Sequence, residues 1–367
     1  MISHAEPASP GASPGETSAP KVLEQLVRQA ERAGASDIHL QMRGRTAEVA
    51  FRLDGVITPG AELTADVAER VFGRIKFLAR LKTYQETLPQ DGRIPHDEIK
   101  SKNDLRVATY PTVTGEKIVL RLFNTETAKS LGELSLPAAA NAELEKFLRQ
   151  TTGLLLLTGP AGSGKTTTIY ACLRRLAELG GRHIITVEDP VEQIVPGTMQ
   201  TEINEAIGLD FARAARHLLR QDPQVLILGE IRDEATAQLA VRAGLTGHLV
   251  ISTLHAGSGK GVFERLLAMC SDHSAVASAV ELVFNQRLVR KVCSACDGAG
   301  CESCLRTGYN GRVPLVEWLR VNESLREQIR RRELTALVPM PTLAASARAL
   351  VNQGVTDEAE FNRVFGL

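Results

Sequence analysis

The sequence predicts an α/β protein with two folded domains: a small α+β domain, followed by a larger domain built on a parallel sheet. Three observations support this fold class. The apolar run 153–157 is followed by a glycine-rich turn and then by apolar residues at helical spacing. Between residues 183 and 255, short apolar strands alternate with helical segments, a pattern typical of parallel sheets with crossover helices. Residues 21–123 instead contain alternating segments separated by tight turns, which is typical of antiparallel strands.

Length, composition and charge narrow the possible function classes. A chain of 367 residues has room for two domains, and an apolar content of 43% is ordinary for a globular protein. Lysine plus arginine and aspartate plus glutamate number 43 each, a balance that argues against a nucleic-acid motor. No run reaches about 18 apolar residues, and no apolar segment follows basic residues near the N-terminus. We therefore expect neither a membrane-spanning nor a secreted chain.

The first domain is expected to begin after a disordered tail. Residues 1–20 are rich in proline, serine, alanine and glycine, and hold too few large apolar side chains to offset the entropy lost on ordering. Residues 21–123 are expected to form the α+β domain, beginning with an amphipathic helix that ends near Gly34. Two strand pairs are predicted, at 37–42 with 46–53 and at 105–110 with 117–122.

A helix of about two dozen residues is predicted between the strand pairs, after the Asp54-Gly55 turn. Its inward-facing residues are expected to be Leu63, Val67, Val71, Ile75 and Leu78. Residues 124–138 are expected to form a linker to the second domain, 139–367, which begins with a helix over about 140–150.

The second domain is expected to place three strands in its sheet, at 183–187, 224–228 and 247–252. Its last part, 313–367, is predicted to be helical. The helices are expected at 315–321, 323–332, 343–352 and 357–364.

A phosphate-binding loop follows the apolar run 153–157. Residues 159–166 fit G-x-x-x-x-G-K-[ST] without a mismatch, between a predicted strand and a predicted helix. Glycines let backbone N–H groups converge on phosphate oxygens, and the helix N-terminus adds a partial positive charge. Lys165 is expected to reach the β- and γ-phosphates of a nucleoside triphosphate, and the Thr166 hydroxyl to bind Mg²⁺. The residues expected to hold the nucleotide are Gly159, Pro160, Ala161, Gly162, Ser163, Gly164, Lys165, Thr166 and Thr167.

Polar side chains follow three of the predicted strands, at the edge where open parallel sheets bind ligands. Glu188 and Glu230 are two carboxylates available to support Mg²⁺ and to position or activate water, and His255 is a candidate γ-phosphate sensor. Taken singly, each acid has a plainer interpretation as a helix cap. His248 is a second candidate sensor. Either histidine could instead contact a neighbouring subunit or be a buried histidine with its hydrogen bonds satisfied.

Several segments resemble motifs of the secretion ATPase superfamily, which drives type II secretion and type IV pili. The segment 187–192 (VEDPVE) resembles its aspartate box, and 247–255 (GHLVISTLH) resembles its histidine box. Residues 219–223 (LRQDP) and 227–233 (ILGEIRD) together resemble its atypical Walker B motif.

The first domain is similar to the second N-terminal domain of the same superfamily. The similarity rests on the segments 36–39 (SDIH), 88–93 (LPQDGR) and 111–117 (PTVTGEK). The resemblance covers about residues 21–365. It implies a RecA-like P-loop NTPase core, a PAS-like N-terminal domain, a zinc-knuckle insert and C-terminal helices.

The resemblance also implies roles for the site residues and a ring-shaped assembly. It implies Mg²⁺ and ATP as cofactors, Glu188 as general base or water-positioning carboxylate, Glu230 as support for Mg²⁺, and His255 as sensor of the nucleotide. The family works as a hexamer in which N-terminal arginines complete a neighbour's site. The arginines at matching positions are Arg93, Arg106 and Arg121, which could equally be solvated strand charges.

Two positions depart from the family pattern. Thr87 stands where the family usually has a basic residue, and Gln224 stands where it usually has aspartate. Neither change removes a proposed catalytic group.

A cluster of four cysteines predicts a structural zinc site. Cys293, Cys296, Cys301 and Cys304 form C-x₂-C-x₄-C-x₂-C, which supplies four thiolates for tetrahedral Zn²⁺. The alternative is four unbound thiols. Assembly-type members of the superfamily carry a similar element with a longer loop. Cys172 and Cys270 lie on apolar helix faces and are expected in the core.

The resemblance implies a cytoplasmic, Mg-ATP-driven hexameric motor, associated peripherally with the inner membrane. It would assemble type II secretion pseudopili or type IV pili together with inner-membrane platform and docking proteins, and without nucleic acid. The tetracysteine element favours assembly, since retraction motors generally lack it. The alternatives are a pilus retraction ATPase, a DNA-uptake or DNA-transfer ATPase, and a nucleotide-binding regulator without turnover.

Overall fold

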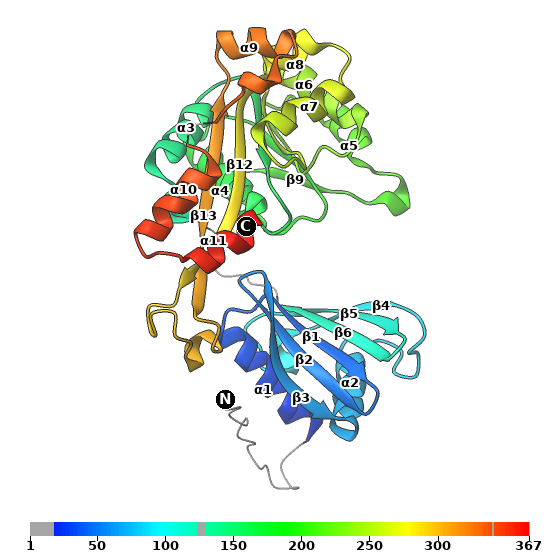
Figure 1. Ribbon diagram of the computed structural model, residues 1–367. Helices are drawn as coiled ribbons and strands as arrows, with labels where there is room; N and C mark the ends of the chain where they lie inside the picture. Colours follow the sequence, from blue (N-terminus) through cyan, green and yellow to red (C-terminus); the bar gives the residue numbers. More distant parts are fainter. Residues whose placement is uncertain (1–17, 123–128, 340, 367) are drawn as a thin grey trace. The chain divides into compact units, whose positions relative to one another are not determined.

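The structure is a computed structural model that describes residues 18–122, 129–339 and 341–366 (Figure 1). The described residues form two compact units. The first contains those of Met1–Glu126 together with Cys293–Gly311, and the second those of Thr127–Val292 together with Arg312–Leu367. Among the described residues, we find no helix with the length and apolar character needed to cross a membrane.

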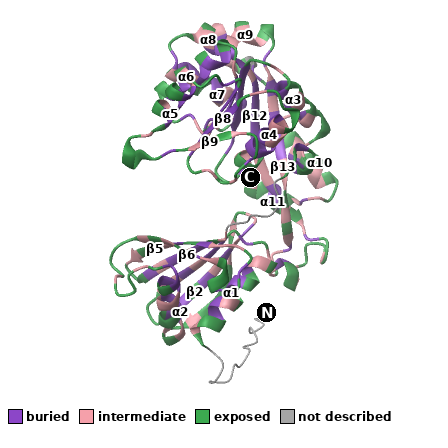
Figure 2. Ribbon diagram, turned by 180° about the vertical axis from the view of Figure 1, so that it is seen from behind, coloured by how far each residue is buried: buried purple, intermediate pink, exposed green. Residues whose placement is uncertain are grey.

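The first unit is built on a six-stranded sheet in the order β3-β2-β1-β6-β5-β4, with neighbouring strands antiparallel. The helices α1 (Ala19–Arg32) and α2 (Ala65–Leu78) pack together and share one apolar core with the sheet (Figure 2). The strands are β1 (Asp37–Arg43), β2 (Thr46–Leu53), β3 (Val56–Thr64), β4 (Gln90–Ile94), β5 (Leu105–Thr112) and β6 (Gly115–Leu122). The two predicted strand pairs and the first helix are confirmed.

The long helix predicted after Asp54-Gly55 is wrong in its first half. Residues 56–64 form β3, which pairs with β2 so that Leu63 lies opposite Ala47. Asp54 and Gly55 both have positive φ, and they form the two-residue turn of a β-hairpin. Pairing across this turn takes precedence over the helical spacing of the apolar residues. The edge strand β4 was also not predicted.

The second unit is built on a seven-stranded sheet in the order β13-β12-β7-β11-β10-β8-β9. The strands from β12 to β9 in this order pair in parallel, and the three predicted strands are confirmed as β8, β10 and β11. The strands are β7 (Gly153–Thr158), β8 (Ile184–Glu188), β9 (Met199–Glu202), β10 (Val225–Leu228), β11 (Leu249–Thr253), β12 (Val280–Val292) and β13 (Tyr309–Arg320).

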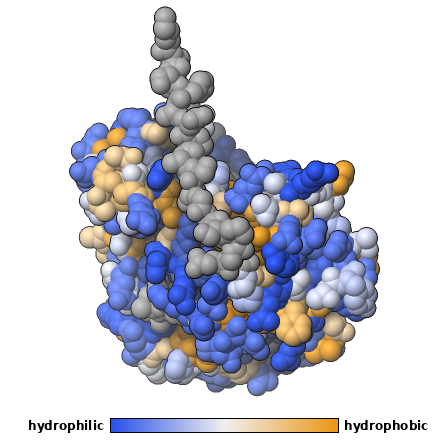
Figure 3. Space-filling view, turned by 90° about the horizontal axis from the view of Figure 1, so that it is seen from below, coloured by the Kyte–Doolittle hydropathy of each residue, from blue (hydrophilic) through white to orange (hydrophobic). Residues whose placement is uncertain are grey.

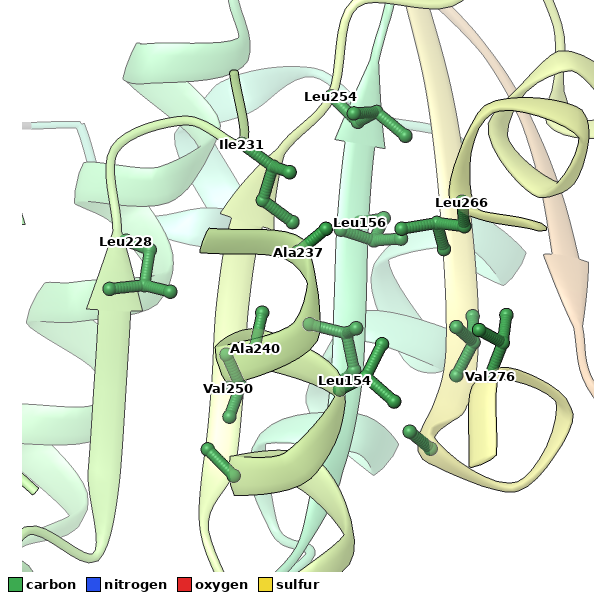
Figure 4. Packing of buried hydrophobic residues seen from close by; sticks show 14 of the residues in the cluster. Leu154, Leu156, Leu228, Ile231, Ala237, Ala240, Val250, Leu254, Leu266 and Val276 are labelled. Carbon is green, nitrogen blue, oxygen red and sulfur yellow. The ribbon is translucent and has the colours of Figure 1, made fainter. Parts of the chain in front are cut away.

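Helices cover both faces of this sheet, because successive residues of a strand point to opposite sides. Leu154 and Leu156 belong to a cluster with residues of α5 to α8. Figure 4 shows part of this cluster, with labelled residues of α6, α7 and α8 near the two leucines. Leu155 and Leu157 belong to a separate cluster with residues of α3 and α4. The helices are α3 (Ala138–Leu148), α4 (Lys165–Leu179), α5 (Phe211–Leu218), α6 (Glu234–Leu245), α7 (Gly259–Met269) and α8 (His273–Ala279).

The helix predicted at 315–321 is wrong, because this segment belongs to strand β13. Leu315, Val316 and Leu319 are buried, and the Trp318 ring stacks on Phe284 of β12 with centroids 6.3 Å apart. Packing against a partner far away in the sequence outweighs local helix propensity here. The remaining C-terminal helices are confirmed as α9 (Glu323–Arg330), α10 (Leu343–Asn352) and α11 (Glu358–Phe365).

The predicted tail and the predicted linker are only partly within the described residues. Residues 1–17 of the expected tail and 123–128 of the linker region lie outside the described residues, whereas 19 and 20 belong to α1. A short 3-10 helix, Leu131–Leu134, buries its two leucines in the core of the second unit.

On the face drawn in Figure 3, hydrophilic residues predominate and hydrophobic residues form small separate patches.

Candidate active site

The phosphate loop joins β7 to α4 and requires its glycines. Gly159, Gly162 and Gly164 all have positive φ, at 133°, 72° and 88°. A Cβ atom on Gly159 would lie 2.1 Å from the carbonyl oxygen of Gln286 in β12, so a side chain cannot be accommodated there. The buried hydroxyl of Ser163, in the same loop, has no hydrogen-bond partner among the described residues. The loop therefore offers a polar group that a phosphate oxygen would satisfy.

Lys165 begins α4 and lies against the loop. Its Nζ donates hydrogen bonds to the carbonyl oxygens of Gly159 and Pro160, both at 2.9 Å. Burial lowers the pKa of Lys165, and the negative charge of Glu230 opposes this shift. In these two hydrogen bonds, the ammonium group is held by backbone carbonyls of the phosphate loop and not by a carboxylate.

Acidic and imidazole side chains meet the loop at one edge of the sheet. Glu188 ends β8, Glu230 follows β10 by two residues and His255 follows β11 by two residues. Because β11, β10 and β8 are adjacent and parallel, their carboxyl ends lie together. These three side chains line one pocket with Lys165 and Thr166.

Glu188 is almost fully buried, at 8% exposure, and accepts hydrogen bonds from neutral donors. The Tyr170 hydroxyl donates to Oε2, and the Thr186 hydroxyl donates to Oε1. The amide of Gln200 in β9 also donates to Oε1, at 3.0 Å. Both carboxylate oxygens are thus held in place by uncharged partners.

Glu230 has charged neighbours instead. Arg232 forms an ion pair with it and also reaches Asp189 Oδ2 at 3.5 Å, and His255 Nε2 lies 3.5 Å from Glu230 Oε2. The hydrogen bond from Arg232 to Glu230 is the main cause that raises the pKa of the arginine. The site therefore contains one carboxylate held by uncharged hydrogen-bond donors and one that pairs with an arginine and lies close to a histidine.

Backbone and hydroxyl contacts hold the strand ends together. The Thr158 hydroxyl, at the end of β7, donates to the carbonyl of Ala256 at 2.8 Å and accepts from its N–H at 3.0 Å. The Thr253 hydroxyl donates to the carbonyl of Gly229 at 2.8 Å. The segments that carry Glu230 and His255 are thereby tied to neighbouring strands.

The second histidine of the histidine box does not belong to this pocket. His248 precedes β11, at the opposite end of the strand from His255. Its Nδ1 lies 3.1 Å from the carbonyl of Ala243, at the end of α6. His248 therefore does not line the pocket that contains His255.

Polar neighbours of both carboxylates were not predicted from the sequence. Tyr170 and Gln200 contact Glu188, and Arg232 contacts Glu230. Arg232 lies inside the quoted Walker B segment, so that motif could have drawn attention to it. Tyr170 and Gln200 had no such signal, because their contacts join residues 12 or more positions apart.

Known proteins resemble this chain over most of its length. The profile of the family described as "Type II/IV secretion system protein" matches residues 13–363. The chain belongs to this family. The "Protein transport protein HofB homolog" of Haemophilus influenzae is 39% identical over 349 residues, which are 94% of this chain and 73% of that protein. The "Type II secretion system ATPase E" of Vibrio cholerae is 35% identical over 376 residues, covering 94% of this chain and 75% of that protein.

A solved structure extends the similarity to three dimensions. The "Crystal Structure of the Pilus Retraction Motor PilT and Bound ADP" has a TM-score of 0.65 at 27% identity, covering 92% of this chain and 95% of that one. Family membership and this structural similarity identify the chain as an ATPase.

The four clustered cysteines of this ATPase fit a tetrahedral metal ion. Their sulfur atoms lie within 4.8 Å of one another, and three pairs are 3.9, 3.9 and 3.7 Å apart. Four thiolates bound to zinc at about 2.3 Å are separated by about 3.8 Å. The N–H groups of Gly300 and Cys301 donate to the sulfurs of Cys296 and Cys304, both at 3.2 Å. Such donors stabilise thiolates, so the donor set fits Zn²⁺.

The cysteine segment packs with the first unit, although the chain reaches it from β12 and leaves it through β13. Leu305, directly after the last cysteine, packs against the core of that unit. The N–H of Gly311 donates to Asp54 Oδ2 at 2.9 Å. Cys172 and Cys270 are buried in the core of the second unit as predicted, and burial raises the pKa of Cys172 to about 12.

The three arginines expected to act on a neighbour lie in the first unit, in one row across its sheet. Arg93 lies opposite Arg106, Arg106 opposite Arg121, and Arg121 opposite Asp37. Residues directly opposite each other share a face of the sheet, and all three arginines are exposed. Arg93 pairs with Asp104, and Arg121 donates to Asp37 at 2.9 Å. Burial raises the pKa of Asp37, but hydrogen bonds from Arg121 and Ser36 and the charges of Arg121 and Arg52 outweigh it, so the pKa is lowered.

Proposed function

We propose that this chain is the Mg-ATP-hydrolysing subunit of a hexameric motor that assembles type II secretion pseudopili or type IV pili. The observation that carries the proposal is the pocket in which Lys165 and Thr166 meet Glu188, Glu230 and His255. A phosphate loop facing two carboxylates supplies both the binding and the hydrolytic functions of an ATPase. Its arrangement on parallel strands supports a RecA-like core, and the antiparallel first unit supports a PAS-like domain.

In this proposal, the loop residues 159–167 cradle the phosphates of ATP with backbone N–H groups, and Ser163 adds its hydroxyl. Lys165 neutralises charge on the β- and γ-phosphates, while Thr166 and Glu230 hold Mg²⁺. Magnesium supplies charge neutralisation at the phosphates. Glu188 orients or deprotonates the attacking water, and His255 senses the γ-phosphate through its proximity to Glu230.

We also propose that the exposed arginine row of the first unit completes the site of a neighbouring subunit. Arg93, Arg106 and Arg121 concentrate positive charge on one face of the sheet, which suits charge developing on a γ-phosphate. An intersubunit test mixes two inactive variants, Lys165→Ala and Arg106→Ala. Partial recovery of ATP turnover in the mixture supports action between subunits. A mixture as inactive as its components contradicts it.

The proposed partners are inner-membrane platform and docking proteins, with the motor on the cytoplasmic face. A relative named as a type II secretion system ATPase supports assembly, as does the tetracysteine element. A pilus retraction motor is the second candidate, favoured by the similarity to PilT. The equal numbers of acidic and basic residues argue against a DNA-transfer ATPase.

The function is tested by measuring phosphate release from ATP with the full chain. We expect turnover that requires Mg²⁺, is abolished by EDTA and is unaffected by double-stranded DNA. A mass measurement with ATP and Mg²⁺ should give six subunits. DNA-stimulated turnover would contradict the secretion function, and absence of turnover in every condition would favour a regulator.

We propose that the tetracysteine element binds one structural Zn²⁺. Elemental analysis of the full chain should give about one zinc per chain. Substitution by Co²⁺ should produce the absorption of a tetrahedral tetrathiolate site, and a Cys301→Ser variant should lose it. A protein that carries no metal after expression with zinc contradicts this part of the proposal.

A further inference from the structure

The hydroxyl group of Tyr170 connects three parts of the nucleotide site: helix α4, the Glu188 carboxylate and the backbone at residues 192–193. It lies on α4, five residues after Lys165, and is 3% exposed. Its hydroxyl donates a hydrogen bond to Glu188 Oε2. The same oxygen accepts hydrogen bonds from the backbone N–H groups of Glu192, at 2.9 Å, and Gln193, at 3.2 Å.

The three hydrogen bonds to Glu188 differ in where their donors lie. Thr186 is on β8 itself, and Gln200 is on the adjacent strand β9, so both hold the carboxylate to the sheet. Tyr170 is on the helix that begins with the phosphate loop. Among the described residues, it provides the hydrogen bond that joins the Glu188 carboxylate directly to this helix.

The Tyr170 hydroxyl keeps its proton and can therefore always donate a hydrogen bond. Burial, followed by the hydrogen bond to Glu188, raises the pKa of Tyr170, so the phenol stays protonated at any physiological pH. A protonated phenol can donate only one hydrogen bond, and the two backbone N–H groups occupy its acceptor side. This arrangement fixes the direction of the O–H bond toward Glu188.

We propose that Tyr170 is a positioning residue, which holds the Glu188 carboxylate at a set place relative to the phosphate loop. It also ties the segment after β8 to the same point. The inference rests on the proposed function, in which Glu188 acts on the attacking water. Catalysis is sensitive to such placement, because a small displacement of a reacting group lowers the rate strongly.

The test is the variant Tyr170→Phe, which removes the hydroxyl and keeps the ring. We expect kcat for ATP to fall by about 10- to 100-fold, the equivalent of one hydrogen bond to a charged group, while KM changes by less than about twofold.

Two control variants separate positioning from other effects. Thr186→Val also removes a donor from Glu188 but leaves the connection to α4, so we expect a smaller loss of kcat. Tyr84→Phe makes the same change at a tyrosine that is 80% exposed and should behave like the wild type. Equal losses of kcat in Tyr170→Phe and Thr186→Val would overturn the proposal.

A double-mutant cycle keeps the test valid if Tyr170→Phe weakens folding. In a Glu188→Asp background, the shorter side chain no longer reaches Tyr170, so the further loss of kcat from Tyr170→Phe should largely disappear. Full additivity of the two losses would show that Tyr170 does not act through Glu188. If wild-type protein hydrolyses ATP and Tyr170→Phe is unchanged, this inference fails alone. If Glu188→Gln retains full turnover, the proposed function of Glu188 fails as well.

Discussion

Glu188 and Glu230 occupy neighbouring strand ends of the same sheet but have opposite surroundings. The carboxylate of Glu188 is buried and accepts hydrogen bonds from Tyr170, Thr186 and Gln200, all of them neutral. The side chain of Glu230 is 21% exposed and faces Arg232 and His255. The strand ends determine where the two acids lie, and the neighbouring side chains determine what each acid can do.

The different neighbours of the two carboxylates indicate that they have different functions. Several neutral donors fix an orientation, because each hydrogen bond has a preferred direction. A cationic neighbour such as Arg232 can be replaced by another cation, and its attraction is weaker where solvent reaches the pair. We therefore expect Glu188 to be rigid, and Glu230 to be the carboxylate that exchanges its partner for a metal ion.

The largest expected effect concerns hydrolysis. Glu230→Gln should retain ATP binding and lose turnover by about 10²- to 10³-fold, because the variant lacks the charge proposed to support Mg²⁺. Binding of a fluorescent ATP analogue and phosphate release measure the two properties separately. Unchanged turnover would contradict the function proposed for Glu230.

The next largest effect concerns the free energy of unfolding, which should differ between variants of Glu188 and Glu230. Glu188→Gln places an amide NH₂ group among three donors, so we expect a loss of about 1.5–3 kcal/mol in the free energy of unfolding. Glu230→Gln should change it by no more than about 0.5 kcal/mol, since the side chain is partly exposed. Urea denaturation followed by tryptophan fluorescence, with Trp318 in the second unit as the single reporter, compares the variants. Equal stabilities would contradict the contrast between a fixed and an exchangeable carboxylate.

The smallest effect concerns salt. A double-mutant cycle on Arg232→Ala and Glu230→Gln should give a coupling energy of about 0.2–1 kcal/mol that declines as salt rises to about 1 M. The matching cycle on Tyr170→Phe and Glu188→Gln should give a larger value that salt leaves unchanged. A salt-sensitive coupling between Tyr170 and Glu188 would show that the two sites are more alike than their contacts suggest.

The candidate site was predictable where its signal is local in the sequence. The phosphate loop needs glycines and Lys165 at fixed spacing, and Glu188, Glu230 and His255 each follow an apolar strand directly. The four cysteines likewise form two local pairs, whose sulfur atoms the structure brings together. In each case, neighbouring positions in the sequence carry the information.

Tertiary structure decided the features that depend on distant partners. Hairpin pairing with β2 makes a strand of residues 56–64, and packing against β12 makes a strand of residues 315–320, where helical spacing had indicated helices. The neutral donors of Glu188 and the packing of Leu305 with the first unit also join residues far apart in the chain. The sequence by itself determined which chemical groups stand at the strand ends, because motif spacing and strand periodicity are local. The environment of each group was decided only when the sheet and helices packed, because hydrogen bonds and burial depend on distances in space.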